Sequence, residues 1–154
     1  MRGLMITALV LGAIVLVPSG AHLLELPHKF AMGRDAYFVT QQLYAGWAVF
    51  GIPIISAIFV DLLLWRSQRR AGDTRAWLAL SSAALIALGL VIFFVWIFPA
   101  NRETENWTIV TDDWGMLRLQ WEYAHAVVAA LTLAAFICVA MCCSTARRIG
   151  KPAP

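Results

Sequence analysis

The run from Tyr123 to Cys143, YAHAVVAALTLAAFICVAMCC, decides the fold class. It contains no Asp, Glu, Lys or Arg, and His125 is its one strongly polar side chain. A helix over this run covers about 30 Å at 1.5 Å of rise per residue, which matches the hydrocarbon core of a bilayer. The strict alternation of a barrel strand is absent. The run therefore predicts a transmembrane helix.

Three further apolar runs of similar length lie upstream, within a chain of 154 residues that is 61% hydrophobic and 14% charged. Soluble domains are less apolar and carry more charge than this. We predict a single all-α domain, an integral membrane four-helix bundle. The expected transmembrane helices cover approximately 4–26, 36–66, 75–99 and 113–145.

The first run also fits a secretory signal, since Arg2 and an apolar core precede "PSGA" and His22. We expect it to be retained as the first transmembrane helix. Within the predicted helices, Pro18 and Pro53 are expected to cause kinks. Pro27 and Pro99 are expected to mark the ends of the first and third helices.

Basic residues predict the orientation of the bundle. They concentrate between the second and third helices and after the fourth: Arg66, Arg69, Arg70, Arg75, Arg147, Arg148 and Lys151. By the positive-inside rule both termini are cytoplasmic. We expect the inner membrane of a bacterium. The net charge of +3 belongs to these flanks, so nucleic acid is not an expected partner.

Polar side chains gather at the opposite, non-cytoplasmic end of the predicted bundle. This set includes all three histidines of the chain: His22, Glu25, His28, Gln41, Gln42, Asn101, Asn106, Arg118, Gln120, Glu122 and His125. Ionisable groups inside a bilayer are costly, and such groups are usually functional. His28 and Lys29, at the expected end of the first helix, are predicted to be solvated.

Two spacings within this set point to a common centre. In "HLLE" His22 and Glu25 stand three residues apart, as do Glu122 and His125 in "EYAH", so each pair shares one helix face. Facing helices of di-iron proteins use a similar Glu-x-x-His arrangement, but the two further glutamates are missing here. A single transition metal (Fe, Cu, Zn or Mn) on these four residues is the more economical hypothesis.

Structural explanations compete with this interpretation. Glu122 and Arg118 are four residues apart and would suit an intrahelical ion pair. Both imidazoles would also be satisfied by donating to backbone carbonyls. The depth of His125, about 16 Å along the helix from Trp114, favours a functional polar pocket instead.

Four blocks of the sequence resemble the anthrone oxygenase-like family of small four-helix membrane proteins. They are GAHLLELPHKFAM (20–32), QQLYAGWAVFG (41–51), FPANRETENWT (98–108) and LRLQWEYAHA (117–126), and the likeness runs from about His22 through the fourth helix. The resemblance implies oxidation of polycyclic anthrones to anthraquinones without a bound organic cofactor. The matching positions are His22, Glu25, Asn101, Asn106, Trp107, Arg118, Trp121, Glu122 and His125.

The resemblance implies an oxidoreductase of the oxygenase type, and we expect it to take a lipophilic aromatic substrate from the lipid bilayer. The candidate catalytic residues are His22, Glu25, Arg118, Glu122 and His125, and the candidate substrate-binding residues are Asn101, Asn106, Trp107, Trp121 and Gln41. An imidazole would act as the base, and Arg118 and Asn106 would stabilise an oxyanion. The alternative is a non-enzymatic metal-binding or accessory subunit. Any protein partner, including further copies in a homo-oligomer, is expected to associate through the helices.

Overall fold

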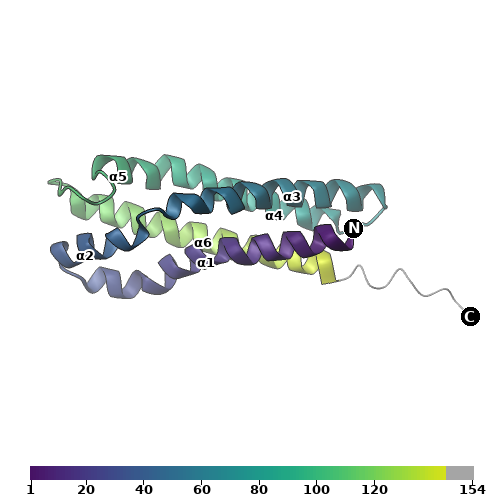
Figure 1. The fold of residues 1–154 in the computed structure, drawn as a ribbon, viewed down its shortest axis with the longest axis horizontal. Coiled ribbons are helices and arrows are strands. Elements are labelled where there is room, and N and C mark those ends of the chain that lie inside the picture. The colour runs from purple at the N-terminus through teal and green to yellow at the C-terminus, as the bar shows by residue number, and fades with distance from the viewer. Residues whose placement is uncertain (145–154) are drawn as a thin grey trace, which may run out of the picture.

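The computed structural model describes residues 1–144, and these residues form helices and turns with no strand. Figure 1 shows the helices lying side by side along one long axis. In chain order the elements are α1 (Arg2–Ala31), α2 (Arg34–Gln41), η1 (Gln42–Tyr44), η2 (Trp47–Phe50), α3 (Gly51–Arg70), α4 (Ala76–Ile92), η3 (Phe93–Ile97), α5 (Phe98–Glu103) and α6 (Trp114–Ser144).

Four stretches of these elements are long and apolar enough to cross a membrane. They are Arg2–Ala31, Trp47–Arg70, Ala76–Glu103 and Trp114–Ser144. This confirms the predicted four-helix membrane bundle. The N-terminus and the turn between α3 and α4 lie at one end, here called the terminal end, whereas α2 and α5 lie at the other, the α2 end (Figure 1). Residue 145 and the basic residues Arg147, Arg148 and Lys151 lie outside the described residues.

The first helix is longer than predicted, because Pro27 does not end it. Pro18 and Pro27 both lie inside α1, which continues to Ala31. The last carbonyls of α1 have partners from another helix: the Arg118 guanidinium of α6 donates to Lys29 O (2.8 Å) and to Met32 O (3.0 Å). Capping of exposed carbonyls stabilises a helix end. The last turn of α1 is therefore stabilised by hydrogen bonds from α6.

The helix expected over 36–66 is interrupted. α2 ends at Gln41, two short 3₁₀ turns follow, and α3 begins at Gly51. Gly46 has φ 84°, a left-handed conformation that glycine adopts at little cost and that cannot continue a right-handed helix. Pro53 then falls in the first turn of α3, where its missing N–H has no intrahelical partner to lose. The break, and not a kink at Pro53, is what shapes this segment.

The third membrane-crossing stretch changes helix type near its end. A π-helical turn, η3, joins α4 to α5, and α5 runs past Pro99 to Glu103. Pro99 has no N–H to donate to the carbonyl of Val95, and the wider turn accommodates the proline. Gln120 of α6 donates its amide to Trp96 O at 2.7 Å, which satisfies one carbonyl of the π turn. The prediction that Pro99 ends this helix was wrong.

The bundle packs differently at its two ends. Toward the terminal end the core consists of small and aliphatic side chains, among them Ala8, Leu64, Ala79 and Val139. A Cβ added to Gly12 would lie 3.0 Å from the Phe136 ring, so α1 and α6 approach closely there. At the α2 end the core is aromatic (Tyr37, Phe38, Trp107 and Trp121). The candidate site lies in this aromatic half.

Candidate functional site

Two imidazoles from different helices meet inside the α2 half of the bundle. His22 of α1 and His125 of α6 have ring centroids 4.0 Å apart at an angle of 32°. Trp121 lies 4.1 Å from His125 and meets His22 edge-on at 5.0 Å. Tyr44, 4.5 Å from His22, belongs to the interrupted segment. Neither imidazole makes a hydrogen bond within residues 1–144, so donation to a backbone carbonyl is not their role.

A buried lysine stands beside this pair. Lys29 is 1% exposed, and its Nζ lies 3.3 Å from Glu25 Oε2 and 3.5 Å from Glu122 Oε1. The ammonium also lies over the rings of Tyr44 (4.4 Å) and Trp121 (5.0 Å). The prediction that Lys29 is solvated was wrong, because α1 continues past Pro27 and turns Lys29 inward one turn after Glu25. His28 is exposed, as predicted.

Glu122 is a fully enclosed carboxylate at 1% exposure. Its Oε1 atom accepts from the Tyr37 hydroxyl at 3.0 Å and from Gln41 Nε2 at 3.5 Å, both on α2, and faces Lys29. Its Oε2 atom has no hydrogen-bond partner within the described chain. The short helix α2 therefore serves to hold one oxygen of a buried acid while the other stays free.

The second carboxylate, Glu25, lies nearer the surface. It accepts a hydrogen bond from the Tyr44 hydroxyl, and its side chain is 44% exposed. Burial, more than the adjacent carboxylates, raises the pKa of Tyr44, and the same order of causes applies to Tyr37 beside Glu122. Both phenols therefore keep their protons at neutral pH and act as hydrogen-bond donors to the two carboxylates.

Arg118 contacts the end of α1. It caps α1 through the two carbonyl bonds described above, and its guanidinium lies over the rings of Phe30, Tyr37 and Trp114 at 5.4, 4.9 and 5.8 Å. Within the described residues it forms no ion pair with Glu122. The i, i+4 pair considered above is thus not the arrangement, and Arg118 positions Lys29 through the backbone.

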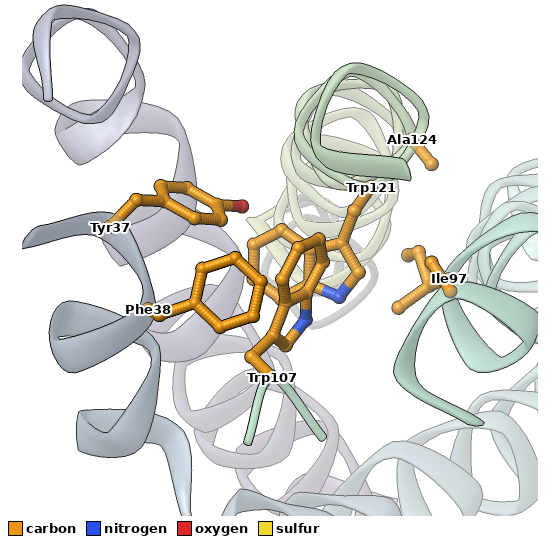
Figure 2. Close-up of a cluster of buried hydrophobic side chains, with 7 residues drawn as sticks. Tyr37, Phe38, Ile97, Trp107, Trp121 and Ala124 are labelled. Carbon is orange, nitrogen blue, oxygen red and sulfur yellow. The ribbon is translucent and has the colours of Figure 1, made fainter. Parts of the chain in front are cut away.

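Asn101 fixes the two tryptophans that wall the site. Its Oδ1 atom accepts from Trp107 Nε1 (3.0 Å) and from Trp121 Nε1 (2.7 Å). Figure 2 shows the two indoles against each other, with Tyr37 and Phe38 of α2 closing one side. Trp107 is 3% exposed, so it is part of the aromatic core.

Asn106, in contrast, belongs to the loop and not to the cluster. Its backbone N–H donates to Asn101 O at 2.6 Å and its side chain is exposed. Glu105, Asn106 and Trp107 all have positive φ values of 45°, 57° and 62°. Three consecutive left-handed residues other than glycine raise the conformational free energy of the loop. The same loop conformation places Trp107 in the core.

The four predicted metal ligands come together only in part. The two imidazoles contact each other with their rings tilted by 32°, and the Lys29 ammonium lies between the carboxylates of Glu25 and Glu122. In the part of the chain that the structure describes, no group of three or more His, Cys, Asp or Glu side chains is arranged to hold one metal ion. The residues as placed do not fit a metal centre. A bound transition metal stays a prediction for elemental analysis.

Several buried polar atoms of the site are available to a ligand. His22 Nδ1, Gln41 Oε1 and Glu122 Oε2 have no hydrogen-bond partner within residues 1–144, whereas Lys29 Nζ makes no hydrogen bond there but is ion-paired with Glu25 and Glu122. Buried polar atoms in proteins are nearly always hydrogen-bonded. Together they provide an ammonium donor, two oxygen acceptors and an imidazole nitrogen, a set suited to a hydroxyl or carbonyl group on an otherwise apolar molecule.

Sequence reasoning missed Lys29, Tyr37, Tyr44 and Trp47. Lys29 had a usable signal, since it stands four residues after Glu25 on a helix. Tyr44 and Trp47 had none, because an uninterrupted second helix would have directed them differently. No family model, curated protein or solved structure matches the chain.

Proposed function

We propose that this protein is a membrane oxidoreductase that oxidises a lipophilic aromatic substrate, of the anthrone type, at the His22–His125 site. The observation that carries the proposal is the pair of imidazoles in contact, without hydrogen bonds within residues 1–144, beside the buried ammonium of Lys29. Imidazoles held for structural reasons are usually hydrogen-bonded, whereas a general base must be free to take a proton.

The aromatic surroundings support an apolar, flat substrate. Tyr44, Trp47 and Trp121 lie within 5.6 Å of the His22 ring. Tyr44, Trp47, Glu25 and His125 are partly exposed on the flank of the bundle beside the break in the second span. A substrate dissolved in the bilayer would reach the imidazoles through this flank and stack on the indoles.

The chemistry begins with proton transfer. An imidazole removes a proton from the carbon opposite the carbonyl of the anthrone, and the Lys29 ammonium stabilises the enolate oxygen that forms. In the proposal Lys29 takes the oxyanion role that the sequence suggested for Arg118 and Asn106. The electron-rich carbon then reacts with dioxygen, which is the oxidant. One oxygen atom becomes the new carbonyl of the quinone, and the other leaves as water with the two hydrogens removed.

The orientation is part of the same proposal. Arg66, Arg69, Arg70 and Arg75 lie at the terminal end, which the positive-inside rule assigns to the cytoplasm. The site then opens on the non-cytoplasmic side, and in a bacterium the membrane would be the inner one. Cysteine accessibility at exposed positions of each end, such as 74 and 105, tests this assignment.

The activity test uses detergent-purified protein with an anthrone and dioxygen. We expect quinone formation in the wild type, and a loss of activity of at least 100-fold in His125→Ala and His22→Ala, the usual contribution of a general base. His28→Ala, which removes an exposed histidine three residues from Glu25, is the matched control and keeps its activity.

Elemental analysis of the same preparations separates the remaining alternatives. Stoichiometric metal that is lost in the two site variants would support the ligand role of the histidines. Folded protein without turnover on any aromatic tested would instead favour the accessory subunit. Unchanged turnover in both histidine variants would contradict the proposed site.

A further inference from the structure

A second buried acid lies in the bundle, on helices that take no part in the histidine site. Asp61 of α3 is 2% exposed, and its Oδ2 accepts a hydrogen bond of 2.6 Å from the Ser82 hydroxyl of α4. Its Oδ1 atom has no hydrogen-bond partner among residues 1–144. Asp61 stands nine residues before Arg70, about 14 Å from the terminal end along the helix, within a membrane-crossing stretch.

Asp61 has no counter-ion among residues 1–144. Within the described residues no Lys, Arg or His side chain lies at ion-pair distance from it. α4 contributes the Ser82 hydroxyl, α6 contributes the thiols of Cys142 and Cys143, and α1 carries no titratable side chain between Arg2 and His22. A carboxylate without a counter-ion in such a place is strongly disfavoured.

The polar neighbours of Asp61 follow one face of α3 toward the terminal end. Trp65 and Gln68 stand four and seven residues after it, and their Nε1 and Nε2 atoms also lack hydrogen-bond partners in the described chain. Gln68 Oε1 accepts from the Cys142 thiol at 2.8 Å, and this thiol also contacts Arg75 O. Consecutive turns of the helix thus present polar atoms that water can bridge.

We propose that Asp61 and Ser82 form a proton-binding site inside the bundle, which exchanges its proton with the terminal end along the Trp65–Gln68 face of α3. A proton fits this place better than a metal cation. Among residues 1–144, the Ser82 hydroxyl is the one side chain that hydrogen-bonds to the Asp61 carboxyl, whereas hard cations require six or more oxygen ligands. The nearest side-chain nitrogens on the α3 face, of Trp65 and Gln68, are donors that would repel a cation.

Infrared spectroscopy tests the proposal without any knowledge of a substrate. At neutral pH we expect the wild type to show the carbonyl band of a protonated carboxylic acid that Asp61→Asn lacks. The band is detected in the difference spectrum between the two proteins. Asp35→Asn is the matched control, because Asp35 has an exposed side chain and its removal should delete carboxylate bands. Loss of carboxylate bands in Asp61→Asn as well would overturn the proton site.

The exchange route has its own measurement. In D₂O the acid band of the wild type should shift to the deuterated position, and Gln68→Leu should slow this shift several-fold. Thr132→Val, which removes a buried hydroxyl bonded to Ser19 on the other side of the bundle, should leave the exchange rate unchanged. Equal exchange in Gln68→Leu and wild type would overturn the route. Neither measurement depends on the chemistry at His22 and His125, so each can fail or succeed independently of the proposed function.

Discussion

The two buried acids of the bundle, Glu122 and Asp61, are nearly equally inaccessible but are stabilised in opposite ways. Glu122 faces the Lys29 ammonium and accepts from a phenol and an amide. Asp61 accepts from one hydroxyl and faces no cation within residues 1–144. The comparison teaches that burial alone does not determine the charge of a carboxyl group. The charge depends on the groups at hydrogen-bond distance. Where donors and a cation replace the lost hydration, the carboxylate form is stabilised; where they are missing, the protonated acid is favoured.

The largest expected change in stability follows from replacing Lys29. Lys29→Met should lower the free energy of unfolding by about 3–5 kcal/mol, because it leaves Glu122 buried without its counter-charge. Chemical denaturation in a mild detergent measures this. His28→Met, the exposed neighbour, is the control and should change little. Adding Glu122→Gln to Lys29→Met should restore part of the lost free energy of unfolding. A double variant that loses as much stability as the two single variants together, or more, would contradict the pairing.

Replacing each acid with its amide should lower the free energy of unfolding by different amounts. Glu122→Gln replaces charged hydrogen bonds with neutral ones and should cost about 2–3 kcal/mol. Asp61→Asn replaces a neutral acid with an amide of similar shape and should stay within about 1 kcal/mol of the wild type. Denaturation of both variants in the same detergent compares them directly. Equal losses would mean that the two acids are in the same charge state.

Asn101→Leu tests how far the aromatic wall depends on one amide. It removes the acceptor of two buried indole N–H groups and should cost about 2 kcal/mol. Tryptophan fluorescence should change with it. Asn101→Asp keeps an acceptor oxygen and is the matched control. An unchanged emission spectrum in Asn101→Leu would show that the indoles are held by packing alone.

The smallest expected effect is a gain. Glu105→Gly relieves a left-handed residue and should raise the stability by about 0.5–1 kcal/mol. Glu103→Gly, two residues earlier at the end of helix α5, should instead be neutral or destabilising. A loss of stability in both variants would indicate that side-chain contacts of Glu105 outweigh its backbone conformation.

The sequence predicted the bundle because apolar length is a one-dimensional property. Each run needed only to match the thickness of a bilayer, and the described helices confirm four such stretches. Histidine and glutamate spacing also placed His22 and Glu122 correctly on inward faces. The break at Gly46 was not predictable in the same way, because a single glycine in an apolar run is common in membrane helices.

The charge balance of the site could not be predicted from spacing. Whether Lys29 lies inside or outside depends on whether α1 continues past Pro27, and this depends on Arg118, almost ninety residues later in the chain. Arg118 has two kinds of possible partner: Glu122, four residues later on the same helix, and the backbone carbonyls of another helix. Only the packing of α1 against α6 decides between them.

The capping of α1 by Arg118 has a consequence for biosynthesis. Helices enter the membrane in the order of translation, so α1 is made long before α6. During that interval the last turn of α1 lacks its cap, and Lys29 has Glu25 but not Glu122 as a partner. The site therefore cannot assemble until α6 has been inserted. A chain that stalls before α6 therefore has Lys29 paired with Glu25 alone, and the last turn of α1 is without the two hydrogen bonds from Arg118.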